Sequence, residues 1–247
     1  MTNEKEFIDS LVPEYITSDI SSQTRYMRDL MIRTFKPYIR VGGGCALELG
    51  SEIGYMSERI AELVCQIDIV DGSEDFLEKV KTRNILNANY YCSLFEEFVA
   101  PIKYDYVFMS HVLEHLVDDH FVLSKVKDEF LAKKGYLFIT VPNARALSRQ
   151  LARHMGMISS LYDLTPNDIR GGHRRVYDRV TLNRAIEHAG FEIIAQGGLF
   201  FKPFSDFQLD QLIDSKFLKT EHQEGLYRLG QEYPDMCGDL YAVCKSQ

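Results

Sequence analysis

Short apolar runs alternate with amphipathic stretches along residues 46–141. The runs at 46–49 and 67–70 predict buried strands, because each is too short for a buried helix and ends at a glycine or an acid. Between them, residues 55–64 carry apolar side chains at helical spacing. A further run at 135–141, closed by Pro142, predicts another strand. Strands that alternate with helices predict a parallel sheet of the α/β class.

Two segments depart from this alternation. Residues before about 40 contain one predicted helix, from Ser21 to Tyr38, which begins at a good N-cap residue. Residues 143–179 interrupt the alternation, and a helix at 181–189 and strands at 191–196 and 240–244 then complete the sheet. We therefore expect an N-terminal helical cover at 1–40 and a domain at 41–247 with a cap insertion at about 143–179.

Composition and charge narrow the classes of function. The formal net charge of -8 over 247 residues disfavours nucleic acid as a partner, because binding to phosphates needs a concentrated cationic face. Five scattered cysteines without a Cys-x-x-Cys pair indicate neither a disulfide framework nor a structural zinc site, which is typical of a reduced, cytoplasmic protein. The first residues lack the pattern of a signal peptide and no apolar run is long enough to cross a bilayer, so we expect no membrane association.

The segment 48–54, with the sequence ELGSEIG, joins the first predicted strand to the helix that follows. Its glycines let the backbone turn sharply, and Asp71 ends the next strand, where an acid can accept hydrogen bonds from ribose hydroxyls. This order predicts a pocket for a nucleotide-type cofactor. An NAD(P) oxidoreductase would need Gly-x-Gly-x-x-Gly for the pyrophosphate, which this turn lacks. The negative charge of Glu52 inside the turn favours a cationic ligand.

From residue 46 to residue 244 the sequence resembles the class I S-adenosylmethionine-dependent methyltransferases. In that family the first strand ends in an acid-x-Gly-x-Gly-x-Gly turn, which Glu48, Gly50 and Gly54 match, with Glu52 in place of the middle glycine. The resemblance implies a Rossmann-like, mostly parallel sheet with one antiparallel final strand, S-adenosylmethionine as the cofactor, and a ribose-binding role for Asp71. The cofactor-binding residues that it implies are Glu48, Gly50, Gly54, Asp71, Gly72, Ser93, Leu94 and His111.

Residues 103–116 resemble the strand and turn that reach the methionine end of the cofactor in this family, most closely in the ubiquinone-type O-methyltransferases and the natural-product and sugar methyltransferases. The segment 111–115, HVLEH, also matches the His-x-x-Glu-His motif of zinc proteases. In those enzymes the motif must lie within a helix, and here it follows a predicted strand. The ubiquinone-type enzymes have an acid where His111 stands and are associated with a divalent metal. His111, Glu114 and His115 therefore leave a divalent metal open as an additional cofactor.

The interruption at 143–179 opens onto the carboxyl edge of the predicted sheet, where the cofactor is expected. Its segment 170–177, RGGHRRVY, combines glycines, arginines and an aromatic ring, which suits contacts with polar or flat parts of a substrate. The alternative is a loop whose arginines pair with surface acids. The expected substrate contacts are His173, Arg174, Tyr177 and Asn143. The aromatic segment 199–204 is expected to pack in a lid or against a partner subunit, which allows a homodimer.

Methyl transfer to an alcohol needs a base that takes the hydroxyl proton, whereas a neutral amine attacks unaided. His115 is the first candidate for this catalytic base and His111 the second. The sequence therefore predicts an enzyme that methylates a small molecule, with O-methylation of a sugar or natural-product hydroxyl preferred. Two alternatives stay open: N-methylation of a small amine, and a non-catalytic protein that binds S-adenosylmethionine for regulation or scaffolding.

Overall fold

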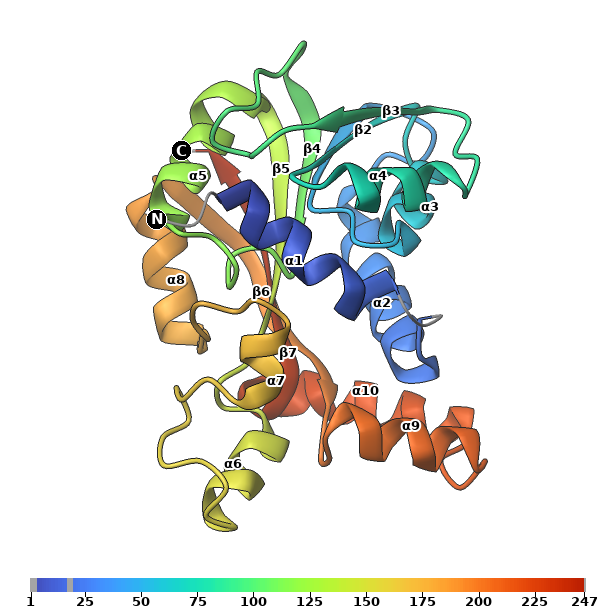
Figure 1. Cartoon of the computed structure of the whole chain (residues 1–247), viewed down its shortest axis with the longest axis vertical. Coiled ribbons are helices and arrows are strands. Elements are labelled where there is room, and N and C mark those ends of the chain that lie inside the picture. Colours follow the sequence, from blue (N-terminus) through green and yellow to red (C-terminus); the bar gives the residue numbers. More distant parts are fainter. Residues whose placement is uncertain (1–3, 17–19, 247) are drawn as a thin grey trace.

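The computed structural model describes residues 4–16 and 20–246, which are built around one seven-stranded sheet (Figure 1). The strand order is β3-β2-β1-β4-β5-β7-β6, and every neighbouring pair is parallel except those that include β7. This confirms the predicted mostly parallel sheet with an antiparallel final strand. The strands are β1 Cys45–Leu49, β2 Gln66–Asp71, β3 Ala88–Cys92, β4 Tyr104–Ser110, β5 Leu131–Pro142, β6 Phe191–Phe201 and β7 Cys237–Ser246.

Helices pack on both faces of this sheet (Figure 1). A 3-10 turn follows α2 at Lys36–Tyr38, a π-helical turn follows α5 at Val126–Phe130, and a second 3-10 turn precedes β7 at Pro234–Met236. The α-helices are α1 Glu4–Ile16, α2 Ser22–Phe35, α3 Tyr55–Ala61, α4 Glu74–Lys81, α5 Asp119–Lys125, α6 Leu147–His154, α7 Pro166–Arg170, α8 Arg179–His188, α9 Asp206–Asp214 and α10 Thr220–Glu232. None of the helices in the described part of the chain has both the length and the apolar character needed to cross a membrane.

The central strands are buried on both faces because successive side chains alternate between two apolar layers. On β1, Leu47 belongs to the layer that contains α5 and α8, whereas Ala46 belongs to the layer that contains α2 and α3. Phe35 of α2 packs in the second layer against the ring of Phe138 on β5, with ring centroids 4.8 Å apart. Strands held from both sides fix the positions of the loops that leave their carboxyl ends.

Most predicted elements are present, with shifted ends. The helix predicted at 21–38 is α2 with its 3-10 turn, and the hydroxyl of Ser21 caps it by accepting a hydrogen bond from the N–H of Thr24. The strand predicted at 191–196 continues to Phe201, because Gly197 and Gly198 keep pairing with β7. Five helices, α1, α6, α7, α9 and α10, lie where the sequence analysis predicts no helix. Of their apolar side chains only Val12 in α1 and Leu209 in α9 are buried, so these helices add little to the core of the sheet domain.

Helix α1 crosses the carboxyl edge of the sheet (Figure 1). The Tyr15 ring meets the ring of Phe76 on α4 at a centroid distance of 5.9 Å, and its hydroxyl donates to the carbonyl of Gly171 over 2.8 Å. At the other end of the helix, Glu4 pairs with Arg174 over 2.8 Å. Helix α1 thus connects α4 to the cap segment, in the place where the sequence predicts an N-terminal cover.

Candidate active site

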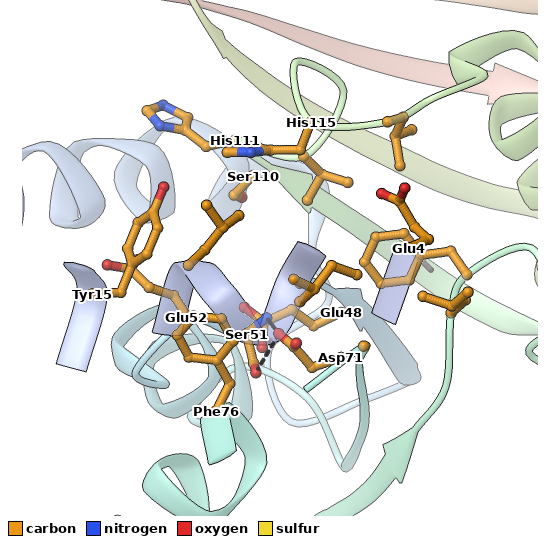
Figure 2. Close-up of a pocket in the computed structure, with 18 of the residues that line it drawn as sticks. Glu4, Tyr15, Glu48, Ser51, Glu52, Asp71, Phe76, Ser110, His111 and His115 are labelled. Atoms are coloured by element: carbon orange, nitrogen blue, oxygen red, sulfur yellow. Dashed lines mark hydrogen bonds between the residues drawn. The ribbon is translucent and has the colours of Figure 1, made fainter. Parts of the chain in front are cut away.

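A pocket of about 190 Å³ opens under α1 at the carboxyl ends of β1, β2 and β4 (Figure 2). The turns after these strands form its floor, α1 forms one wall, and the cap contributes His173. The predicted site residues that line this pocket are Glu48, Gly50, Asp71, Gly72, Leu94, His111, His115 and His173. The structure therefore brings together residues that the sequence assigned to three separate roles: cofactor binding, catalysis and substrate contact.

The turn after β1 has a left-handed backbone at three positions. Gly50, Glu52 and Gly54 have φ angles of 79°, 49° and 81°. A Cβ atom at Gly54 would lie 2.8 Å from a methyl group of Val80, so this glycine permits the close packing of α3 on α4 rather than lining the pocket. Glu52 adopts a conformation that favours glycine, and its carboxylate pairs with Arg28 of α2 over 3.1 Å. Because Arg28 offsets this charge, Glu52 is a weaker argument for a cationic ligand than the sequence suggested.

The stronger indication of a cationic ligand is the buried carboxyl group of Glu48. The side chain is 1% exposed at the end of β1 and lines the pocket, and its Oε2 atom accepts no hydrogen bond from the described residues. Burial raises the pKa of Glu48 to about 8. A buried acceptor without a partner is costly unless a ligand supplies a donor, and the ammonium group of S-adenosylmethionine is such a donor. The residues present therefore fit this cofactor.

Asp71 lines the same part of the pocket as Glu48 (Figure 2). One carboxylate oxygen accepts hydrogen bonds from the backbone N–H and the hydroxyl of Ser51, over 2.8 and 3.0 Å, and the other accepts one from the N–H of Ser73 over 3.0 Å. Burial raises the pKa of Asp71, and these donors oppose that shift. The carboxylate thus ties the turn after β1 to the end of β2, with acceptor sites still facing the pocket.

Ser93 lies outside the pocket lining, although the sequence assigned it to the cofactor. Its N–H donates to the carbonyl of Asp71 and its hydroxyl to the carbonyl of Leu94, over 2.9 Å each. The residue closes the end of β3, and its neighbour Leu94 supplies the surface that faces the pocket.

His111 and His115 follow β4 and face different partners. His111 has a left-handed φ of 57°, and its Nε2 lies 3.1 Å from Oδ2 of Asp239 on β7. Burial would raise the pKa of Asp239, but neighbouring His111 holds it below its usual value. The imidazole of His111, which lines the pocket, is therefore oriented by a carboxylate. The sequence analysis did not identify Asp239 as the partner of His111, because the two residues lie 128 positions apart.

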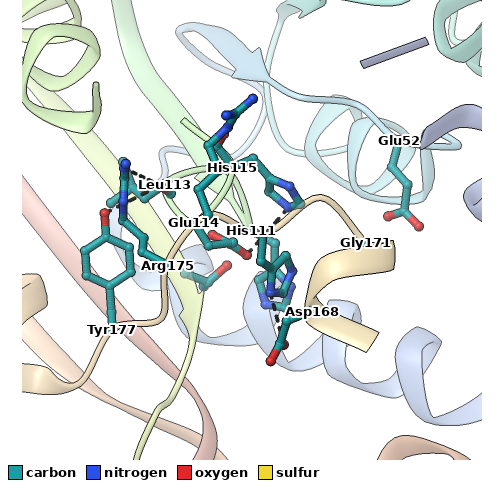
Figure 3. A network of polar contacts seen from close by, with 12 residues as sticks. Glu52, His111, Leu113, Glu114, His115, Asp168, Gly171, Arg175 and Tyr177 are labelled. Carbon is teal, nitrogen blue, oxygen red and sulfur yellow. Dashed lines mark hydrogen bonds and ion pairs between the residues drawn. The ribbon is translucent and has the colours of Figure 1, made fainter. Parts of the chain in front are cut away.

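His115 belongs to a polar cluster with Glu114 and His173 (Figure 3). Glu114 is fully buried, neither of its carboxylate oxygens accepts a hydrogen bond from the described residues, and Oε1 lies 4.0 Å from Nε2 of His115. The rings of His115 and His173 meet edge to face at a centroid distance of 4.8 Å. Burial lowers the pKa of His115, with His173 and His111 acting in the same direction against the carboxylate of Glu114. His115 is therefore neutral at neutral pH and can accept a proton.

His173 is held by a second carboxylate, that of Asp168. Its Nδ1 lies 3.2 Å from Oδ1 of Asp168, while Arg149 and Thr165 donate hydrogen bonds to the other oxygen of that carboxylate. Burial opposes charge on His173, but the contact with Asp168 raises the pKa above its usual value. The same contacts outweigh burial and hold the pKa of Asp168 below its usual range. The cap therefore presents to His115 an imidazole whose orientation is set by Asp168.

The three ligand atoms of Glu114, His115 and His173 lie within 4.8 Å of one another, a spacing that a divalent cation could bridge. The sequence analysis left a divalent metal open at a different set of residues, His111, Glu114 and His115. The structure replaces His111 by His173 in that group, because His111 faces Asp239.

A family model described as a methyltransferase domain matches residues 20–196. The chain belongs to this family, the class I S-adenosylmethionine-dependent methyltransferases. The predicted family and cofactor class are thereby confirmed.

Relatives and solved structures extend this finding. The chain is 35% identical over 163 residues to N-terminal Xaa-Pro-Lys N-methyltransferase 1 of Danio rerio, a match that covers 63% of this chain and 65% of that protein. Shorter matches cover 40% of the related protein of Xenopus laevis and 39% of that of Rattus norvegicus.

The fold is similar to that of N-methyltransferase NodS of Bradyrhizobium japonicum, with a TM-score of 0.62 and 12% identity over 99% of each chain. It is also similar to the [4+2]-cyclase SpnF, with a TM-score of 0.65 and 15% identity over 99% of this chain and 97% of that one. Structures with such different names share the fold, so fold similarity does not identify the acceptor.

Three of the predicted substrate contacts of this methyltransferase do not line the pocket. Arg174 donates to the backbone carbonyl of His115 and pairs with Glu4. This agrees with the alternative interpretation of the segment 170–177, a loop whose arginines pair with acids. The hydroxyl of Tyr177 donates to Asp119, and the buried amide of Asn143 donates to the carbonyls of Asp235 and Cys237. These side chains support the fold around the site, and of the predicted substrate contacts only His173 faces the pocket.

Proposed function

We propose that this protein transfers a methyl group from S-adenosylmethionine to an amine nitrogen, with His115 accepting the proton that the amine must lose. The observation that carries the proposal is the fully buried carboxylate of Glu114, which has no hydrogen-bond partner among the described residues and lies 4.0 Å from His115. A carboxylate in that position favours positive charge at the acceptor end of the pocket.

The charges around the pocket support nitrogen over oxygen. Arg28 pairs with Glu52 and Arg174 with Glu4, and within the described residues no lysine or arginine pairs with Glu48, Asp71 or Glu114. The carboxylates of Asp71 and Glu114 lower the cost of bringing in an ammonium ion, whereas they would oppose an alcohol that becomes an alkoxide. The hydroxyl acceptor preferred on sequence alone remains the competing prediction.

S-adenosylmethionine, when bound, supplies a methyl group on a strong electrophile. The amine arrives protonated and has no lone pair to attack until a base removes one proton. His115 is neutral because its pKa is lowered, so it can take that proton, and Glu114 beside it stabilises the imidazolium that results. The cap holds His173, oriented by Asp168, against His115 and so fixes the orientation of the His115 ring.

Similarity to the N-terminal Xaa-Pro-Lys N-methyltransferases also supports nitrogen as the acceptor. The relative from Danio rerio shares 35% of the residues over the matched region, which spans 65% of that protein. A protein or peptide amine is therefore included beside small amines as an acceptor class.

Matched acceptor pairs test the proposal. The protein is incubated with methyl-labelled S-adenosylmethionine and an amino sugar or its parent sugar, and with a peptide that begins Xaa-Pro-Lys or its N-acetylated form. We expect label on the amine of at least one pair and none on the matched hydroxyl or acetylated compound. Label that appears on hydroxyl acceptors alone contradicts the proposal. Tight binding of S-adenosylhomocysteine with no transfer to any acceptor would favour a scaffold instead.

A further inference from the structure

Two cysteine thiols lie against each other at the amino ends of β1 and β2, the edge of the sheet opposite the pocket. The Sγ atoms of Cys45 and Cys65 are 3.9 Å apart. Cys45 pairs in the sheet with Gln66, the residue directly after Cys65, and the N–H of Cys65 donates to the carbonyl of Gly44 over 3.1 Å. The strand pairing therefore holds the two cysteine backbones side by side.

We propose that Cys45 and Cys65 form a reversible disulfide bond when the protein meets a low-molecular-weight disulfide such as oxidised glutathione. A disulfide bond is about 2.05 Å long, so each sulfur has to move by about 1 Å, which a side-chain rotation provides. Neighbouring strands lie about 4.8 Å apart, and residues at adjoining positions on them have the Cα separation that disulfides span. The bond can form without a rearrangement of the sheet.

The two thiols differ in exposure, which sets the order of the steps. Cys65 is exposed and can be reached by the oxidant, whereas Cys45 is half-buried. Burial raises the pKa of Cys45 to about 11, and the neighbouring Cys65 and Asp105 act in the same direction. Cys65 is therefore the thiol that reacts first, and Cys45 is the one that resolves the intermediate.

The exchange balances in two steps. The thiolate of Cys65 attacks one sulfur of oxidised glutathione, which breaks the S–S bond and releases one glutathione thiolate. Cys45 then loses its proton and its sulfur attacks Sγ of Cys65, which releases the second glutathione thiol. Two protein thiols are oxidised and one glutathione disulfide is reduced to two thiols. The proximity of Cys45 to Cys65 compensates for its low thiolate fraction.

The closed loop contains the cofactor turn. Cys45 and Cys65 are 20 positions apart, and the residues between them form β1, the turn at 50–54 and α3. A cross-link over a loop of this length restricts the unfolded chain, so we expect oxidation to raise the Tm by about 5 °C. The bond lies on the opposite edge from the pocket, so the affinity for S-adenosylhomocysteine should not change.

Cys92 offers a matched control. It is exposed on β3, and its Sγ lies near the carbonyl of Gly72 rather than near another described thiol. The protein bound to S-adenosylhomocysteine is treated with oxidised glutathione, quenched in acid, and analysed by intact mass and by unreduced tryptic peptides. We expect peptides 41–59 and 60–79 to be linked and to separate on reduction, while Cys92 carries a glutathione adduct.

The variants decide between a disulfide and a simple thiol contact. C45S should leave a stable glutathione adduct on Cys65 and abolish the rise in Tm, whereas C92S should retain the link between the two peptides. A wild-type protein in which Cys65 keeps a stable glutathione adduct, or stays a free thiol, overturns the proposal. So does a linked protein whose Tm is unchanged or lower, because the bond would then not fit the folded sheet.

Discussion

The two ends of the pocket hold their polar groups by different means. At the cofactor end, Glu48 and Asp71 sit on strand ends, and backbone donors fix the carboxylate of Asp71. At the acceptor end, His115 and His173 come from loops, and side chains such as Asp168 orient them. Main-chain geometry sets the first end and side-chain pairing sets the second. A change at one end should therefore alter cofactor affinity, and a change at the other should alter turnover.

His115→Gln should have the largest effect of the substitutions considered, and it should act on turnover. Loss of a positioned base slows a proton transfer by about 10²- to 10⁴-fold, so we expect kcat to fall by that factor while the Kd for S-adenosylhomocysteine stays within twofold. If the acceptor is an amine, higher pH deprotonates it in solution and should restore part of the lost rate. Rates measured with the labelled cofactor from pH 6 to 10 check this result, and an unchanged kcat would remove His115 from its proposed role.

The wild-type pH profile and a chelator supply the control. Because the pKa of His115 is lowered, the base stays neutral at pH 7, and activity should fall only on acidification below the usual histidine range. Treatment with a chelator should leave the rate unchanged. A rate that disappears with the chelator and returns with one divalent cation would show that Glu114, His115 and His173 hold a metal instead of providing a base.

The difference between the two ends also explains what the sequence could predict. The cofactor end lies within residues 48–71, where a turn and the acids on adjacent strand ends form one local pattern. The acceptor end needs contacts between distant segments: His173 lies 58 positions after His115, and nothing in the spacing indicates that their rings meet. Asn143 illustrates the same limit, because the carbonyls that bind its amide lie more than 90 positions away.

Helices α1, α6, α7, α9 and α10 were not predicted for a related reason. Each has at most one buried apolar side chain and so lies outside the alternation of strands and helices that forms the core, and the apolar side chains of α1 such as Phe7 and Leu11 line the pocket instead. The contacts of α1 with the pocket depend on single residues such as Tyr15, whose partners Phe76 and Gly171 lie in other elements. Regular strands of the core were predictable because burial on both faces leaves an unbroken apolar run.

Asp71→Ala tests the cofactor end. Loss of a charged hydrogen-bond acceptor for the ribose, worth ~1.5–3 kcal/mol, should weaken S-adenosylhomocysteine binding by about 10- to 100-fold. Asp68→Asn is a matched control, because Asp68 is also a buried acid of β2 but accepts from Tyr104 and Asn89 outside the pocket. Calorimetric titration should show weakened binding for the first variant alone. Equal losses in both would indicate damage to β2 rather than loss of a ribose contact.

The pH dependence of cofactor binding tests Glu48. Its pKa near 8 means that the free protein holds this carboxyl largely protonated at pH 7, whereas an ammonium ligand requires the ionised form. Relative to Glu48→Gln, the affinity for S-adenosylmethionine should therefore rise from pH 7 to a maximum near pH 8 as Glu48 ionises, and fall at higher pH as the α-amino group of the ligand, with a pKa of about 7.7–8.0, loses its proton. The variant is the reference because it keeps the pH effects that do not depend on the Glu48 carboxyl. Parallel pH profiles would exclude Glu48 as the partner of the ammonium group.

Glu52→Gly addresses the one nonstandard position of the turn and has the smallest expected effect. Glycine suits the left-handed backbone at φ 49°, which offsets the lost ion pair, so the Tm should change by only a few degrees. Arg28, which lines the pocket, would then carry an unpaired charge that repels the sulfonium of S-adenosylmethionine, and binding should weaken about threefold. S-adenosylhomocysteine has a neutral sulfur and should lose less affinity, and the double variant with Arg28→Met should recover the loss. If both ligands weaken equally, the cause lies in the geometry of the turn, and the charge of Glu52 has no part in cofactor binding.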